Sequence, residues 1–127
     1  MSDHDPLRGA VERGRAGEDV AALYLRLQGF SILDRNRRGD GGEIDLVARE
    51  GTSLVFVEVR LRRAGARVPA AESISAAKRL RLRAVAGRLL RDRDDLAWPA
   101  RTVRFDVVTL RLDDDGLDLR HLRAVRV

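Results

Sequence analysis

The chain has 127 residues, 35% of them charged, with a formal net charge of +5 and no cysteine. This length allows one hydrophobic core and excludes two independent domains. With no positive-then-apolar leader and no apolar run near membrane-spanning length, the sequence predicts a cytoplasmic protein without a membrane partner. The modest positive excess favours a polyanionic partner.

The first element expected along the chain is a helix over about 10–28, because apolar residues recur at helical spacing and Gly29 supplies a C-terminal stop. The recurring residues are Val20, Leu23, Tyr24 and Leu27. Residues 1–8 are polar and are predicted to be a flexible N-terminus, and residues 9–127 a single domain.

Two strongly apolar strands are predicted over 42–48 and 54–60. They follow a short predicted strand over 30–36 and a basic, glycine-rich segment, 37–42, that is predicted to be a loop. Between the apolar strands, Gly51-Thr52 suits a type II′ hairpin turn, which takes glycine at its first central position.

This turn fixes which residues face each other across the hairpin. The predicted pairs are Asp45 with Glu58, Glu43 with Arg60, and Val47 with Phe56. Their Cβ atoms should lie about 5 Å apart, and strand alternation puts all six on one face. The other face is predicted to be entirely apolar core, formed by Ile44, Leu46, Ala48, Val55, Val57 and Val59.

A second helix is predicted over about 75–91, with Ser75 as its N-cap, after a basic loop over 62–69. Its apolar stripe consists of Ile74, Leu82, Val85 and Leu89. Lys78 lies in the middle of this stripe, and it is the single lysine of a chain in which arginine outnumbers lysine 24 to 1. Such an imbalance indicates biased coding, which makes most arginines weak evidence and the retained lysine more informative.

The chain ends with two predicted strands, over 103–110 and 117–125, around a turn at 113–116. The order of elements is therefore helix, three strands, helix, two strands. This order predicts an α/β fold with a mixed central sheet flanked by helices.

The carboxylates of Asp45 and Glu58 are the strongest functional signal, because buried carboxylates are costly unless they are neutralised, paired or bound to a metal. Two acids on adjacent strands, followed by the cationic Arg60, are the smallest set of side chains that metal-assisted phosphodiester hydrolysis requires. Mg²⁺ or Mn²⁺ would suit the oxygen ligands, and the cation would stabilise charge at the phosphate.

At this point the chain resembles a known family. Glu18, Asp45 and Glu58-Val59-Arg60 look like the pattern of the PD-(D/E)XK nuclease superfamily, especially its Holliday junction resolvase-like branch. Six blocks between residues 14 and 108 are similar, more narrowly, to the small bacterial YraN family of endonuclease-like proteins. The blocks are Gly14-Arg15-Ala16-Gly17-Glu18, Tyr24-Leu25, Arg35-Asn36-Arg37-Arg38, Gly42-Glu43-Ile44-Asp45-Leu46-Val47, Val55-Phe56-Val57-Glu58-Val59-Arg60 and Arg104-Phe105-Asp106-Val107-Val108.

The resemblance implies a restriction-endonuclease-like αβββαββ core and a metal-dependent endonuclease acting on DNA, including branched or otherwise structured DNA. It implies metal ligation by Asp45, Glu58, the Val59 carbonyl and Glu18. Arg60 would stand at the position of the catalytic lysine, and a two-fold dimer is compatible with the likeness to junction resolvases.

The arginine at position 60 departs from the pattern, because a guanidinium stays protonated and cannot act as a general base. Lys78 is an alternative cation, since a side chain in the first turn of the second helix can reach the same site. The catalytic candidates are therefore Glu18, Asp45, Glu58, Arg60 and Lys78.

Five arginines flank the expected site and are candidates for phosphate contacts. They are Arg37, Arg38, Arg62, Arg63 and Arg67. Glu43 and Asp106 are candidates for supporting roles next to the metal ligands. The aromatic residues are expected to be core, and His4 and His121 are too isolated in the sequence to indicate a metal cluster.

Three alternatives stay open from the residues alone. Asp45 and Glu58 can be satisfied by ion pairs with Arg60 or Arg104, and Glu43 by a cross-strand salt bridge with Arg60. The fold can also serve as a nucleic-acid-binding module without turnover, which would bind DNA without cleaving it. A protein-interaction subunit would bind neither metal nor nucleic acid.

Overall fold

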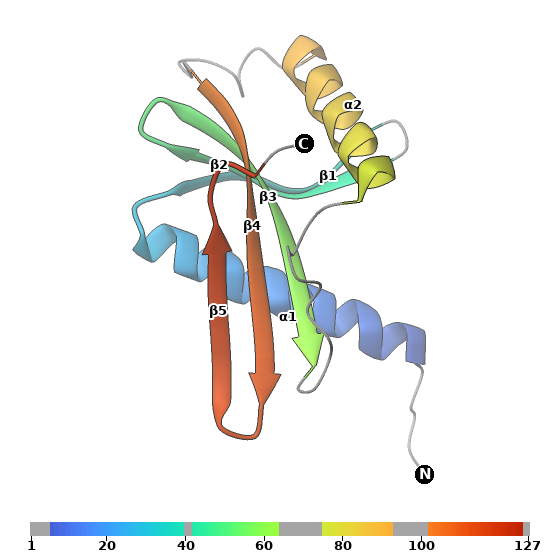
Figure 1. Cartoon of the computed structure of the whole chain (residues 1–127), viewed down its shortest axis with the longest axis vertical. Helices are drawn as coiled ribbons and strands as arrows, with labels where there is room; N and C mark the ends of the chain where they lie inside the picture. The colour runs from blue at the N-terminus through green and yellow to red at the C-terminus, as the bar shows by residue number, and fades with distance from the viewer. Residues whose placement is uncertain (1–5, 40–41, 64–74, 93–101, 126–127) are drawn as a thin grey trace.

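The computed structural model describes residues 6–39, 42–63, 75–92 and 102–125. The elements are α1 (Pro6–Leu27), β1 (Ser31–Gly39), β2 (Gly42–Glu50), β3 (Ser53–Arg63), α2 (Ala76–Asp92), β4 (Thr102–Asp113) and β5 (Gly116–Leu122) (Figure 1). The predicted α/β class, with the order helix, three strands, helix, two strands, is confirmed.

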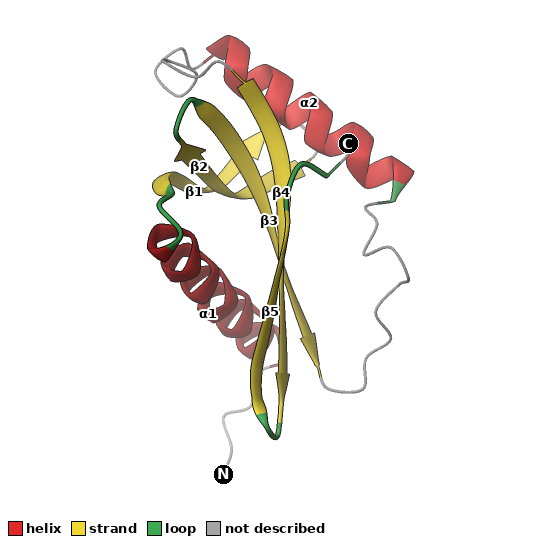
Figure 2. Ribbon diagram, turned by 60° about the vertical axis from the view of Figure 1, so that its left-hand side comes forward, coloured by secondary structure: helices red, strands yellow, loops and turns green. Residues whose placement is uncertain are grey.

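The strands form one five-stranded sheet in the order β1-β2-β3-β4-β5. Neighbouring strands are antiparallel except β3 and β4, which are parallel and joined through α2. A parallel pair needs a crossover, and here the crossover contains the second helix. The sheet is therefore mixed, as predicted, and Figure 2 shows α1 and α2 on its opposite faces.

Each face of the sheet has its own apolar core. The core under α1 contains Leu46, Ala48, Val55 and Val57 from the hairpin, packed against Ala21, Ala22 and Leu25 of the helix. The core under α2 contains Ile44, Val47, Leu54 and Phe56, packed against Leu82, Val85 and Ala86. Phe30 and Phe56 are buried, so the expectation that they are core aromatics is confirmed.

The turn between β2 and β3 follows the prediction. Gly51 has a φ of +58°, which a type II′ turn requires at its first central position and which glycine adopts without strain. The predicted register holds from Glu50 opposite Ser53 to Leu46 opposite Val57.

The predicted pairing is wrong beyond that point, because the paired register of β2 and β3 ends at Leu46 and Val57. Asp45 opposite Glu58 is therefore not a ladder pair, and Glu43 pairs with Arg38 of β1.

The predicted division of β2 into an apolar and a charged face is also wrong. Ile44 packs in the core under α2 and Leu46 in the core under α1, although they are two positions apart. Strict alternation would put both on one face, so the strand is irregular at Asp45. On β1, Asn36 is likewise irregular, with a φ of +53°.

Several predicted boundaries shift by a few residues. Arg37 and Arg38 belong to β1 and not to a loop, and Arg62 and Arg63 belong to the end of β3. The first helix begins at Pro6, inside the segment expected to be flexible, and the last strand ends at Leu122. Residues 64–74, which include most of the predicted basic loop, lie outside the described residues.

The second helix begins as predicted, with Ser75 Oγ accepting a hydrogen bond of 3.2 Å from the Lys78 backbone N–H. Leu82 and Val85 of its predicted stripe are buried, whereas the side chains of Ile74 and Leu89 lie outside the described part of the chain. Within the described ranges, no helix is both long and apolar enough to cross a membrane.

Candidate metal centre

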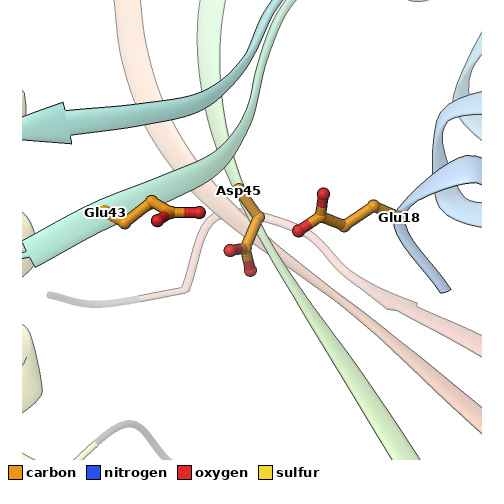
Figure 3. Close-up of side chains that lie close together, drawn as sticks. All are labelled: Glu18, Glu43 and Asp45. Atoms are coloured by element: carbon orange, nitrogen blue, oxygen red, sulfur yellow. The ribbon is translucent and has the colours of Figure 1, made fainter. Parts of the chain in front are cut away.

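Three carboxylates converge where β2 becomes irregular. Glu18 comes from α1, and Glu43 and Asp45 come from β2 (Figure 3). Each offers one carboxylate oxygen, and these three oxygens lie within 4.8 Å of one another. Such a group could hold a metal ion, because closely spaced carboxylate oxygens are the donors that hard divalent cations prefer.

Packing of α1 against the sheet brings Glu18 to this position. A Cβ at the neighbouring Gly17 would lie 3.6 Å from Leu110 and 3.9 Å from Leu61, in ordinary van der Waals contact, so the α1 backbone lies close to β3 and β4 at this point. The Glu18 side chain is consequently 13% exposed, and its Oε2 has no hydrogen-bond partner. Arg35 Nη2 of β1 lies 3.8 Å from this oxygen.

A hydrogen bond from β3 fixes the Asp45 carboxylate, although β2 is no longer paired with β3 at this position. Its Oδ2 accepts a hydrogen bond of 2.8 Å from the backbone N–H of Val59 in β3. The carboxylate thereby occupies the place where the β2–β3 ladder would otherwise continue.

Burial and neighbouring negative charges raise the pKa of Asp45 and of Glu18. Burial is the main cause of the rise of the Asp45 pKa to about 6, and the negative charges of Glu58, Glu18 and Glu43 add to it, against the Val59 hydrogen bond. Burial also raises the pKa of Glu18, although a hydrogen bond with Asn36 and the charge of Arg35 oppose this. A divalent cation would relieve both the burial cost and the repulsion.

Glu58 lies next to this group but is paired with cations. The Lys78 ammonium of α2 forms an ion pair with Glu58 Oε1, and Arg60 lies 3.8 Å from Oε2. Glu58 Oε2 is buried without a hydrogen-bond partner. The ion pair between Glu58 and Arg60, anticipated as an alternative, therefore exists, whereas Arg104 pairs with other acids.

The grouping therefore differs from the ligand set expected from the sequence. Glu43, expected only in a supporting role, belongs to the converging carboxylates, while Glu58 faces Lys78 and Arg60. Glu43 also has a cation of its own, because Arg38 Nε lies 3.5 Å from its Oε2.

Four of the five arginines proposed for phosphate contacts lie on β1 and β3. Arg37 is ion-paired with Asp34 at 2.8 Å, and the Arg38 side chain is 86% exposed. Arg62 is half-buried in β3, and Arg67 and the Arg63 side chain are outside the described residues.

Asp106 of β4 belongs to a different cluster from the converging carboxylates. It is fully buried and accepts hydrogen bonds from Arg104 Nε at 3.0 Å and the Ala124 N–H at 3.0 Å, and His121 Nε2 lies 2.8 Å from its Oδ2. Burial alone would raise its pKa, but the hydrogen bonds from His121, Arg104 and Ala124 outweigh burial and lower it to about 2.

The cluster extends across the fold on both sides of Asp106. His121 Nδ1 lies 2.9 Å from the Tyr24 hydroxyl of α1, and Arg104 also donates to Glu50 of β2 at 2.8 Å. Sequence reasoning missed this network and treated His121 as isolated. Tyr24 and His121 are 97 residues apart, so no local pattern joins them.

Comparison with known proteins gives a consistent family assignment. The model of the uncharacterised protein family UPF0102, the YraN family, matches residues 17–110. A UPF0102 protein of Desulfitobacterium hafniense strain Y51 is 42% identical over 114 residues, covering 90% of this chain and 88% of the relative. One from Syntrophotalea carbinolica is 45% identical over 109 residues, covering 85% of each chain.

Among solved structures, Pyrococcus furiosus SfsA in complex with Ca²⁺ matches with a TM-score of 0.39 and 14% identity. The match covers 93% of this chain and 65% of that chain.

Proposed function

This chain belongs to the uncharacterised protein family UPF0102, and we propose that it is a metal-dependent endonuclease whose ion is held by Glu18, Glu43 and Asp45. The convergence of these three carboxylates is the observation that carries the proposal. The three oxygens, within 4.8 Å of one another, are of the donor type that Mg²⁺ and Mn²⁺ prefer. Glu58 and the Val59 carbonyl are further candidate ligands.

A bound Mg²⁺ or Mn²⁺ would polarise the scissile phosphate and lower the pKa of the attacking water. In the hydrolysis, the water oxygen forms a bond to phosphorus while the bond to the leaving sugar oxygen breaks, and the leaving oxygen takes up a proton. Arg60 and Lys78 carry positive charge beside Glu58, so either can stabilise the negative charge that develops on the phosphate. Lys78 can also transfer a proton, which Arg60 cannot.

Nucleic acid is the substrate class that suits this site, with DNA as the first candidate. The net charge of +5 favours a polyanion, and the exposed Arg38 lies beside Glu43. Arg37, Arg62, Arg63 and Arg67 are further candidates for phosphate contacts.

Manganese binding to the purified protein is the first test, measured by titration calorimetry. Asp45→Asn and Glu18→Gln should each weaken binding by more than about tenfold, because each removes a charged ligand. Asp19→Asn is the matched control, since Asp19 adjoins Glu18 in α1 but its side chain is 65% exposed and paired with Arg35. Equal binding by Asp45→Asn and the control would contradict the metal site.

Cleavage is the second test, with junction, flap, single-stranded and duplex DNA in Mg²⁺ or Mn²⁺. The wild-type protein and Asp19→Asn should cut at least one of these substrates, and Asp45→Asn should not. Lys78→Arg tests whether Lys78 acts through its charge or through proton transfer, because arginine keeps the positive charge but cannot transfer a proton. If neither metal binding nor cleavage is found for the wild type, the proposed activity is wrong.

A nucleic-acid-binding module without turnover is the second candidate. The pairing of both cations, Arg60 and Lys78, with Glu58 favours it, because a cation engaged by a carboxylate is less available to a phosphate. This candidate predicts salt-dependent DNA binding that persists in Asp45→Asn, with no cleavage by the wild type.

A further inference from the structure

The two edges of the sheet differ in how open they are to another strand. The edge strand β1 has a register shift between Ile32 and Asp34, and Asn36 has a positive φ. Irregular, charged edges of this kind resist pairing with another chain. The opposite edge strand, β5, keeps an unbroken register with β4 from Gly116 to Leu122.

Within the described part of the chain, β5 has no strand on its outer side (Figure 1). Its row of outward backbone donors and acceptors is therefore regular, and no other described strand pairs with it.

Exposed apolar side chains accompany this open edge. Leu117 of β5 and its ladder partner Leu112 are 50% and 59% exposed. On the β5 strand itself, the Tyr24 hydroxyl of α1 lies 2.9 Å from His121 Nδ1. An apolar surface next to an open strand edge is characteristic of a protein–protein contact.

The charges on β5 are self-complementary. Asp118 and Arg120 lie on one face of the strand, with side chains 56% and 67% exposed and their charged atoms 3.7 Å apart. Two copies of an antiparallel edge strand pair about a two-fold axis perpendicular to the sheet, which keeps equivalent faces together.

Strand alternation requires the axis to pass through a residue position. In the middle of β5 this allows three registers, with the axis at Asp118, Leu119 or Arg120. An axis at Asp118 faces aspartate with aspartate, and an axis at Arg120 faces arginine with arginine, and both contacts are repulsive. An axis at Leu119 faces Asp118 of each copy with Arg120 of the other, so that opposite charges meet twice.

We propose that two copies of this chain associate through β5, antiparallel about a two-fold axis at Leu119, to form a continuous ten-stranded sheet with both α1 helices on one face. A seven-residue strand alone offers little area compared with the ~1,200 Å² or more of a stable interface, so the exposed Leu112 and Leu117 of the β4–β5 hairpin add to the contact. This association does not depend on the proposed nuclease activity.

Charge reversal tests both the dimer and its register, with sedimentation equilibrium of the full chain as the measurement. Asp118→Arg places arginine opposite arginine, and Arg120→Asp places aspartate opposite aspartate. Each variant alone should dimerise at least about tenfold more weakly than the wild type. An equimolar mixture of the two should recover wild-type affinity as a heterodimer, because each arginine then faces an aspartate.

Recovery on mixing also excludes misfolding as the cause of the loss, since misfolded chains would not complement each other. Leu117→Glu should weaken the dimer, whereas Leu80→Glu, at a leucine 66% exposed on α2, should not. A wild type that stays monomeric up to hundreds of micromolar would overturn the proposal. So would single variants that dimerise like the wild type, or a mixture that does not recover affinity.

Discussion

The buried network around Asp106 gives the sharpest stability prediction, through the substitution Asp106→Asn. The carboxylate is 1% exposed and is bonded to Arg104, His121 and the Ala124 N–H. Asparagine keeps the shape but loses the charge, and its amide NH₂ must face one of these donors. Breaking a buried charged pair costs about 3–5 kcal/mol. Arg104 retains Glu50, so a loss of about 2–4 kcal/mol is expected.

The same substitution should change the pH dependence of stability. The pKa of Asp106 is lowered from 3.8 to about 2, which corresponds to about 2 kcal/mol at 1.36 kcal/mol per unit. Because the folded-state pKa is the lower one, this stabilisation is complete above pH 4 and is lost as the pH falls through 2. The difference between wild type and Asp106→Asn should therefore shrink by about 2 kcal/mol between pH 5 and pH 2.

Urea unfolding followed by circular dichroism measures both effects, and the other carboxylates, which titrate alike in the two proteins, cancel in the comparison. The control is Asp19→Asn, an exposed acid paired with Arg35, which should change the free energy of unfolding by less than about 1 kcal/mol. The reasoning is refuted if Asp106→Asn lies within about 0.5 kcal/mol of wild type at neutral pH, or if the two proteins keep a constant difference down to pH 2.

Three further substitutions test the fold with the same unfolding assay. Tyr24→Phe removes the 2.9 Å hydrogen bond to His121 and should cost about 0.5–1.5 kcal/mol; an unchanged stability would mean that the bond contributes nothing. Leu46→Ala opens a cavity in the core under α1 and should cost about 2–5 kcal/mol, whereas Leu27→Ala, at an exposed leucine, should be close to neutral. Ser75→Ala removes the cap of α2 and should lower the free energy of unfolding by about 0.5–2 kcal/mol. Ser75→Thr keeps a capping hydroxyl and should retain most of that stability.

The local architecture was predictable from the sequence because its causes are local. Helical spacing, strand alternation and the Gly51-Thr52 turn depend on neighbouring residues, and they gave the order of elements and the hairpin register as far as Leu46. The blocks around Glu18, Asp45 and Glu58 likewise identified the family before any geometry was known.

Tertiary structure alone decided which carboxylates meet. Side-chain alternation is interrupted at Asp45, and Asn36 on the adjoining strand has a positive φ. The side-chain pattern of β2 does not predict this backbone distortion. Because of this distortion, Asp45 leaves the β2–β3 ladder, and the close packing of α1 on β3 and β4 at Gly17 brings Glu18 to Glu43 and Asp45, while Glu58 pairs with Lys78. These distances depend on how the helices dock on the sheet.

The residues of the Asp106 network lie far apart in the chain and join for the same reason. Tyr24, Glu50, Asp106 and His121 become linked only when β5 pairs with β4 and α1 packs on one face of the sheet. The sequence by itself thus determined the elements, the family and the acidic character of the site. The packing of segments distant in sequence decided the grouping of the carboxylates, because contacts between such segments depend on the whole fold and not on the spacing within any one of them.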